Sequence, residues 1–554
     1  MRIAYLGTSV SNISQLVAHE AQFSKAQCSS LVFPFPSIRP VRPWKPSTDL
    51  PLIEWYRTSF EREISTLPDK ELRDELIESF FEKVHPGFPV IDEAEFRTRY
   101  ENSENPPPLL LLHAILLVGA HVSNHPRVTK SRSLMKLSLF RRAKSLFDIR
   151  YENDRLNLIQ AALLFTWHLQ GVDDVSANAY YWIGIACRIA FGLGMHRTTS
   201  YGTNAIRMPI HDQRIYRRVW WTIYQLDVLG SLHHGRPLSI DPDECDQLSL
   251  CAEDFIECNS RTNPKVDIDF CIQNAALCEI VGAIVKMSSP GSLRRFRDSP
   301  GSFRTTQANL DTRLVTWYLQ LPSRLSDIHG KNSIFWALLL MAHYNLALLH
   351  LHRLADPTAG DMTGPPPNKS SDTCHVSAQA LIGLLNTMVV KESIGQCWFT
   401  CQTMLLATAL QTSLEARITA RNGPAVLAIQ AQSRLDQLMP IAESLSHYWP
   451  SAEAVWHLYQ GLLKQLKRQT EAASGFNPAV YPAGSGSDKL DSILDIQEAF
   501  DDHTRDTLEN NWAALFGAGY AEPFLDSQQD DIDGLLRMPL GFASNEQIGG
   551  TGRS

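Results

Sequence analysis

The sequence predicts an all-α protein, with a large irregular multi-helix array followed by a disordered acidic C-terminal tail. Apolar residues recur at helical spacing through most of the 554 residues. No segment keeps the alternation of apolar and polar residues that is typical of a half-buried strand. Each predicted helix carries an apolar stripe too wide to face water, so the helices must pack on one another. The pattern has no fixed repeat period, which argues against a regular solenoid.

The first predicted helix begins after Asp69, whose side chain can cap the free amides at a helix start. The segment 85–87 (His-Pro-Gly) ends this helix, because proline cannot continue the hydrogen-bond ladder and glycine accepts a turn. Asp92 and Glu95 are then spaced as a capping box for a short helix that carries Phe96.

Further helices are predicted where the apolar periodicity continues, at residues 109–122, 133–147, 156–170, 177–192, 212–232, 332–353, 375–391, 403–420 and 425–447. Residues 286–306, rich in serine, glycine, proline and arginine, are predicted to form a mobile basic loop. Residues 356–373, with three consecutive prolines, are predicted to form a second loop.

This pattern divides the chain into four predicted parts. Residues 1–66 are predicted to be a partly disordered N-terminal extension, and residues 67–470 are predicted to be a helical domain. Residues 471–488 contain a Gly-Ser-Gly-Ser run and form a flexible linker. Residues 489–554 are an acidic and hydrophobic tail.

Charge and cysteine content limit the class of protein. The chain has 51 basic and 59 acidic side chains and a net charge of −8. A surface that holds DNA by its phosphates is usually basic, so the whole chain does not resemble an autonomous DNA binder. Ten cysteines in a chain of this length are too few for a disulfide framework and indicate reduced thiols in the cytosol or nucleus.

No membrane segment is predicted. Residues 334–351 are apolar and about long enough to span a bilayer. However, His343 and Asn345 would lie near mid-depth, where unpaired polar groups are costly. We therefore interpret this segment as a helix buried inside a helical protein.

The tail combines acidic residues with bulky apolar ones. Residues 488–538 hold 13 acidic side chains against Lys489, Arg505 and Arg537. This composition is typical of disordered activation segments, in which charge keeps the hydrophobic groups available to a partner. The alternative is a solvated tail with an incidental docking helix. The candidate activation residues are Phe500, Trp512, Leu515, Phe516, Phe524 and Leu535.

The most informative segment has two basic residues, paired tryptophans, a tyrosine and an aspartate one turn apart, and then Gly-Arg-Pro before an acidic stretch. These signature residues are Arg217, Arg218, Trp220, Trp221, Tyr224, Asp227, Gly235, Arg236 and Pro237. The segment closely resembles the fungal-specific transcription factor domain, also called the middle homology region of zinc-cluster regulators. Among members of this family, the chain resembles cutinase-type and xylanolytic regulators.

Three further segments match this family in the expected order. Residues 80–91 resemble the opening His-Pro and Phe-Pro segment of the domain, and residues 192–197 are similar to its Gly-Leu-His-Arg helix end. Residues 5–9 resemble the short element that follows the linker after the zinc cluster. The resemblance covers roughly residues 1–450.

The spacing of the signature also has a direct physical interpretation. Trp220 and Tyr224 lie four residues apart, and Tyr224 and Asp227 lie three apart, so each pair shares a helix face. A carboxylate beside bulky apolar groups needs a partner, and we expect Arg236 to provide it across the turn at Gly235.

The resemblance implies a nuclear regulator of metabolic or secondary-metabolite genes. Such a protein contacts the transcription machinery, pairs as a homo- or heterodimer, and in some members binds a small-molecule effector. The DNA reader of the family is a six-cysteine cluster that binds two zinc ions, whereas here Cys28 is the only cysteine before Cys187. We therefore expect no cofactor in this chain, with zinc only if an upstream cluster exists. DNA contact is then indirect or made through that missing cluster.

Two alternatives remain open. The first is a cofactor without a zinc cluster that acts through a zinc-cluster partner. The second is a helical magnesium-dependent enzyme, similar to terpene synthases, based on the aspartate-rich segment 501–506. The chain has no His-Glu-x-x-His, P-loop or Gly-x-Ser-x-Gly motif, and we predict that it is not an enzyme. The cysteines between 245 and 278 lack the close pairs of a structural zinc site.

Overall fold

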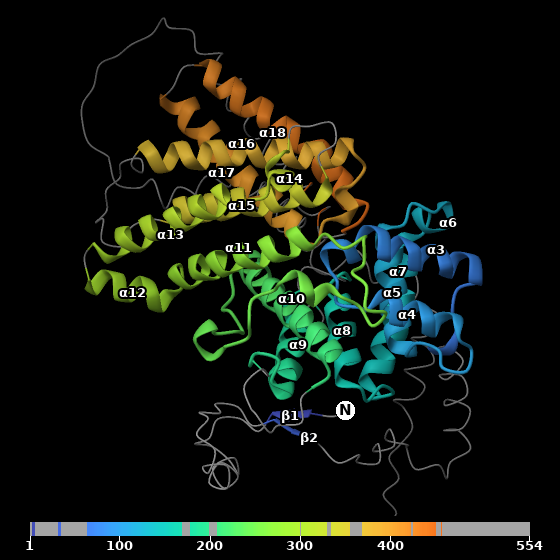
Figure 1. The fold of residues 1–554 in the computed structure, drawn as a ribbon. Helices are drawn as coiled ribbons and strands as arrows, with labels where there is room; N and C mark the ends of the chain where they lie inside the picture. The colour runs from blue at the N-terminus through green and yellow to red at the C-terminus, as the bar shows by residue number, and fades with distance from the viewer. Residues whose placement is uncertain are drawn as a thin grey trace, which may run out of the picture. The chain divides into compact units, whose positions relative to one another are not determined.

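A computed structural model describes residues 64–168, 178–198, 208–299, 301–328, 334–354, 368–422 and 425–449, together with Ala452, Trp456 and two short strands. The described part of the chain is helical, as the sequence predicts (Figure 1). Its helices are α3 Lys70–Lys83, α4 Glu93–Glu101, α5 Leu109–Val122, α6 Pro126–Thr129, α7 Arg132–Asp148, α8 Arg155–Phe165, α9 Ala179–Leu193, α10 Ile210–His234, α11 Ile268–Met287, α12 Pro290–Asp298, α13 Ser302–Leu319, α14 Ser323–Ser326, α15 Phe335–Arg353, α16 Asn368–Val390, α17 Thr400–Asn422 and α18 Ala425–Ser446. Short 3₁₀ helices lie at His85–Gly87, Pro242–Glu244, Ala252–Phe255 and Ile394–Gln396.

The predicted helix starts are confirmed where a side chain caps the first turn. Asp69 accepts a hydrogen bond from the amide of Leu72 at 3.1 Å, which satisfies one free donor at the start of α3. Asp92 accepts one from the amide of Glu95 at 2.9 Å at the start of α4. The bounds of α5 match the predicted residues 109–122, because three prolines precede it and Ser123 leaves the helical conformation.

Helices that follow one another along the chain pack together. α5 contacts α3, α7 and α8 (Figure 1). From α8 onward each helix contacts the next in the series α8, α9, α10, α11, α15, α16, α17 and α18. α15, which contains most of the apolar segment 334–351, contacts α11, α13, α14, α16 and α17. Leu338, Leu340 and Leu349 of this helix are fully buried. The segment is therefore a core helix, as the sequence predicts.

Two crossings are closer than ordinary side chains allow. A Cβ at Gly119 of α5 would lie 2.0 Å from the backbone oxygen of Leu76 in α3, so only glycine fits there. A Cβ at Gly87 would lie 2.2 Å from the ring of Trp336. The His-Pro-Gly stop therefore also lets Trp336 of α15 pack against the 3₁₀ helix His85–Gly87.

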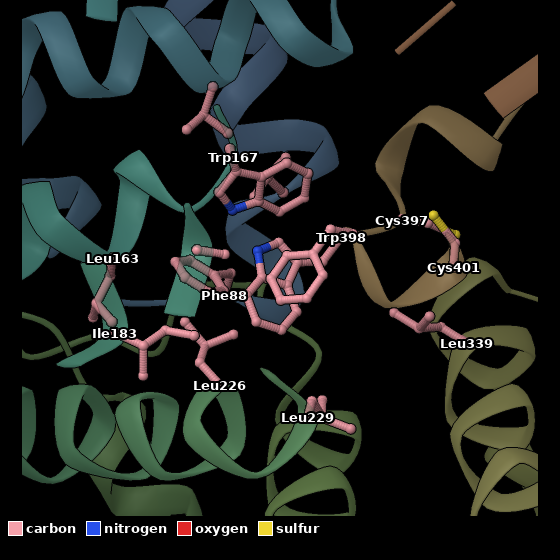
Figure 2. Packing of buried hydrophobic residues seen from close by; sticks show 14 of the residues in the cluster. Phe88, Leu163, Trp167, Ile183, Leu226, Leu229, Leu339, Cys397, Trp398 and Cys401 are labelled. Carbon is pink, nitrogen blue, oxygen red and sulfur yellow. The ribbon is translucent and has the colours of Figure 1, made fainter. Parts of the chain in front are cut away.

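Aromatic side chains from distant segments meet in the core. Figure 2 shows Trp398, which precedes α17, near Phe88, Trp167 and the α10 residues Leu226 and Leu229. The indole N–H of Trp398 donates to the hydroxyl of Thr166 at 3.0 Å. This bond satisfies the polar atom of a residue that otherwise contributes apolar area to the core.

The prediction of a mobile loop at residues 286–306 is wrong. The segment contains the end of α11, all of α12 and the start of α13. Ser289 caps α12 through the amide of Ser292, and Pro290 occupies the first turn, where its missing N–H has no cost. Gly301, with φ of 88°, precedes α13. The residues that suggested a loop are the caps between two helices.

The short strands β1 (Ile3–Tyr5) and β2 (Val32–Pro34) pair antiparallel and are an exception to the all-α prediction. An isolated bridge joins Ile256 and Thr262. Two helical segments in the described residues, Ile268–Met287 and Ser371–Val390, are long and apolar enough to cross a membrane. About half of each is buried in the protein interior, at 56% and 44%, as in core helices.

The chain divides into a unit of residues 1–476 and a second of residues 477–554. The predicted linker, the acidic tail with its candidate activation residues, and the aspartate-rich segment 501–506 all lie outside the described residues. So do residues 356–367 of the second predicted loop, whereas residues 368–373 of that prediction belong to α16.

Candidate functional site

The signature lies on α10, between α9 and α11. Trp220 and Trp221 are 2% and 8% exposed, so both anchor the helix in the core. The ring of Trp220 packs edge-on against Phe191 near the end of α9, with centroids 5.8 Å apart. The indole N–H of Trp221 donates to the carbonyl of Leu248 at 2.8 Å and so ties the segment after the acidic stretch to α10.

Tyr224 sets the distance between α10 and α11. Its ring meets Trp221 edge-on at 5.5 Å, and its hydroxyl oxygen would lie 3.1 Å from a Cβ at Gly282. Burial raises the pKa of the Tyr224 hydroxyl, so this group stays neutral. The small residue on α11 therefore accommodates the tyrosine in a tight contact between the two helices.

The predicted ion pair between Asp227 and Arg236 is wrong. The Asp227 carboxylate accepts the amide of Ser239 at 3.1 and 2.9 Å and the amide of Ile240 at 3.0 Å. Burial raises the pKa of Asp227, and these backbone donors oppose that shift. The guanidinium of Arg236 instead lies over the ring of Tyr180, 5.1 Å from its centroid. The buried Asp227 carboxylate is therefore stabilised by hydrogen bonds from main-chain N–H groups.

The signature loop, residues 235–240, folds back over the end of α10. Gly235 has φ of 60°, the left-handed conformation that ends helices and that glycine adopts without strain. The hydroxyls of Ser231 and Tyr180 both donate to the carbonyl of Pro237, at 3.2 and 2.9 Å. Together with the amides bound by Asp227, these contacts fix the loop at both of its ends.

The acidic stretch after the loop, residues 241–246, binds the Gly-Leu-His-Arg helix end at residues 192–197. Arg197 forms a two-bond ion pair with Asp246, with both N···O distances at 3.0 Å. The amides of Asp246 and Gln247 donate to the carbonyl of His196 at 3.1 Å. Two segments that the family resemblance identifies separately therefore form one structure.

The two basic residues of the signature lie near a second group of carboxylates, one of which Arg217 binds directly. Arg217 donates to Asp254 at 2.5 Å, and the Asp254 side chain is 2% exposed. Arg218 is 2% exposed, and none of its guanidinium nitrogens has a hydrogen-bond partner in the described part of the chain. Burial lowers the pKa of Arg218, and the nearby carboxylates of Asp92 and Glu257 oppose this shift. Arg218 therefore balances negative charge inside the fold.

These carboxylates connect the N-terminal helices to the segment after the acidic stretch. Glu257 accepts the amides of Glu93 and Ala94 at 3.1 and 3.2 Å, at the N-terminus of α4. Asn263 donates to both Glu93 and Glu257, at 2.5 and 3.2 Å. A carboxylate at a helix N-terminus interacts favourably with the helix dipole, so Glu257 stabilises α4 from outside that helix.

The opening segment of the family resemblance is also held by main-chain contacts. The Nε2 atom of His85 lies 2.9 Å from the carbonyl of Ile91. Burial lowers the pKa of His85 to about 4, so the ring is neutral at pH 7. The amide of Asp267 donates to the carbonyl of Pro86 at 2.9 Å. This segment therefore packs against the start of α11.

Within the described residues, no group of three or more His, Cys, Asp or Glu side chains could hold a metal ion. The nine cysteines in that part of the chain are free thiols, including Cys245, Cys251 and Cys258. Burial raises the pKa of all three, to about 11 in each case, so they remain protonated at pH 7.

The sequence did not reveal three residues that fix the signature. Tyr180 supports the loop through both its ring and its hydroxyl, while Asp254 binds Arg217 and Glu257 binds the start of α4. All three lie far along the chain from the groups that they contact. The tyrosine directly follows Asn178 and Ala179 at a helix start, and this local sequence contains no signal for a contact 57 residues away.

Comparison with known proteins supports the resemblance carried by these motifs. The family model described as "Fungal specific transcription factor domain" matches residues 77–318, which include the signature, the opening segment and the helix end. The chain is 36% identical to the acetamidase regulatory protein of Aspergillus fumigatus over 417 residues, covering 74% of this chain and 51% of that protein. It is 29% identical to cutinase transcription factor 1 alpha of Fusarium vanettenii over 493 residues, covering 86% and 51%. The chain thus spans about half the length of these curated relatives.

Proposed function

Because this chain contains a fungal specific transcription factor domain, we propose that it is a transcription regulator controlling metabolic or secondary-metabolite genes in the nucleus. Two relatives support this proposal by their names, which are those of regulators of acetamidase and cutinase. In this proposal the helical unit is the regulatory body, and the tail recruits the transcription machinery.

One observation carries the proposal for the helical unit. The charged signature groups Asp227, Arg217 and Arg236 are each held by contacts within the fold. Active sites generally present a nucleophile, a general base or a metal to a substrate. The signature uses its charges for packing instead, which suits a scaffold that other molecules contact.

DNA contact in this proposal comes from a six-cysteine zinc cluster that residues 1–554 do not supply. The cluster belongs either to the native product or to a zinc-cluster protein that pairs with this chain. The net charge of −8 supports this division of labour, because most affinity for the DNA backbone comes from basic side chains.

A tethered reporter assay tests the role of the tail. Residues 1–554 are fused to an unrelated DNA-binding domain with its operator upstream of a reporter gene. We expect activation that is mostly lost when Phe500, Trp512 and Phe516 are replaced together by alanine. Replacing Asn510 and Asn511 by alanine is the matched control, and we expect it to leave the output unchanged.

A silent fusion, or full activity in the aromatic variant, would rule out the proposed tail function. The magnesium-dependent enzyme finds no support in the names of these relatives. The zinc-cluster partner is tested separately by copurification: a native protein that activates its gene only together with such a partner is the cofactor of the first alternative.

A further inference from the structure

Four basic side chains lie buried together between α5, α7 and the residues that follow α8. Arg132 and Lys136 come from α7, His121 from α5, and His168 from the turn after α8. Their exposed fractions are 9%, 4%, 0% and 5% respectively. This basic cluster lies away from the signature and takes no part in the proposed function of the tail.

Lys136 has few acceptors for its three N–H donors. Its Nζ atom lies 2.7 Å from Nδ1 of His121 and 3.4 Å from the carbonyl oxygen of Tyr448. The ammonium also lies over the ring of Trp449, 5.1 Å from its centroid. An aromatic face attracts a cation, but it does not neutralise its charge.

No carboxylate from the described residues pairs with the cluster. Among the described residues, neither Lys136 nor Arg132 forms an ion pair; Arg132 donates to the carbonyls of Ser123 and His447, at 2.7 and 3.4 Å. Burial and the neighbouring guanidinium lower the pKa of Lys136 to about 7. Burial and Lys136 lower the pKa of His168 to about 3. Buried charges in proteins are normally paired, and the described part of the chain supplies no counter-charge to this cluster.

Nearby donors also lack acceptors. Both ring nitrogens of His168, the indole nitrogen of Trp167 and Nε of Arg132 are buried without a hydrogen-bond partner in the part of the chain that the structure describes. A neutral imidazole keeps one N–H donor and an indole keeps one. The rings of His121 and Trp167 are 5.3 Å apart, so Trp167 and Lys136 both lie next to the His121 ring. Buried polar atoms without partners are few in native proteins, and such a group indicates an absent partner.

We propose that the basic cluster binds a small monoanion through its carboxylate group, and that this anion is an effector of the helical body. One carboxylate would accept hydrogen bonds from Lys136 and from the N–H groups of Trp167 and His168, and it would neutralise the buried lysine. Arg132 already donates to the carbonyls of Ser123 and His447, so Lys136 is the cationic donor left for the ligand. One carboxylate matches its single charge, whereas a phosphate carries nearly two charges at pH 7. The regulatory role of the bound anion rests on the proposed function, whereas the binding itself does not.

The test measures the thermal unfolding of the purified full chain in rising sodium acetate, with sodium chloride keeping the ionic strength constant. A ligand that binds only the folded state raises the unfolding temperature in a saturable way. We expect such a rise for the wild type and for Lys130→Met, a control at an exposed lysine near the start of the same helix. In Lys136→Met we expect the affinity for acetate, from titration calorimetry, to fall at least about tenfold, the effect of losing one charge-assisted contact.

Trp167→Phe keeps an aromatic ring, removes only one donor, and provides the second readout if the lysine variant does not fold. Its affinity for acetate should also fall. The proposal is overturned if acetate does not stabilise the wild type, or if it stabilises the Lys136 or Trp167 variant equally. A rise with inorganic phosphate in place of acetate overturns the carboxylate assignment. None of these results affects the reporter assay, so this site and the proposed function can fail separately.

Discussion

Replacing Asp227 with alanine tests whether the signature loop is fixed by main-chain hydrogen bonds. The carboxylate accepts three contacts between 2.9 and 3.1 Å from the amides of Ser239 and Ile240. Each amide left without an acceptor costs roughly 1–3 kcal/mol, so the two together should lower the free energy of unfolding by about 2–6 kcal/mol. Asp227→Asn keeps one acceptor and should cost about half as much.

Arg236→Ala is the matched variant, because an ion pair with Asp227 would make the two positions interdependent. Its guanidinium contacts the Tyr180 ring, so we expect a loss of about 0.5–1 kcal/mol. Without a direct contact, the effects of the two alanine variants should add to within about 0.5 kcal/mol. Urea unfolding followed by tryptophan fluorescence gives these values where the slope is unchanged. A coupling energy well above 1 kcal/mol between the two substitutions would refute the hydrogen-bond arrangement and restore the ion pair.

Four other substitutions probe the packing of the helical unit. Gly119→Ala places a Cβ 2.0 Å from the Leu76 oxygen and should lower the free energy of unfolding by more than about 2 kcal/mol. Gly184→Ala meets nothing within 4 Å and should raise it by up to about 1 kcal/mol; equal effects of the two would contradict the close helix crossing. Burial lowers the pKa of His343 to about 4 from 6.5, so its contribution to stability is present above pH 6.5 and is lost as the pH falls toward 4. His343→Gln should therefore flatten the pH dependence of unfolding by up to about 1.4 kcal/mol per pH unit in that window, and an unchanged slope would count against a buried neutral ring. Arg218→Met should destabilise by about 3 kcal/mol because it leaves buried carboxylates without their counter-charge, whereas unchanged urea unfolding would show that they do not need it.

Much of the fold could be predicted because the helix signals are local. The prolines before Leu109 and the capping side chain of Asp69 lie next to the elements that they define. The same kind of signal is misleading at residues 286–306, where Ser289 precedes α12 and Gly301 precedes α13. These two helices follow each other closely along the chain. Residues that favour loops also favour helix caps, and composition alone does not separate the two.

The partners of the signature could not be predicted for a different reason. The one-turn spacing of Tyr224 and Asp227 correctly places both on α10 in the core. After the left-handed turn at Gly235, however, the backbone amides of Ser239 and Ile240 point toward the Asp227 carboxylate. Arg236 lies over the ring of Tyr180 in α9. Which groups meet across such a turn depends on tertiary packing that neither residue type nor spacing encodes.

The central claim is that the signature stabilises a regulatory body while the tail carries the activation function. The most direct test measures reporter output per molecule of tethered protein, by quantitative immunoblotting, for the wild type, Asp227→Ala and a chain that ends at residue 488. We expect Asp227→Ala to lower the output only in proportion to its lower abundance, and we expect removal of the tail to lower the output per molecule. A loss of output per molecule in Asp227→Ala at wild-type abundance, or full output without the tail, would contradict the account.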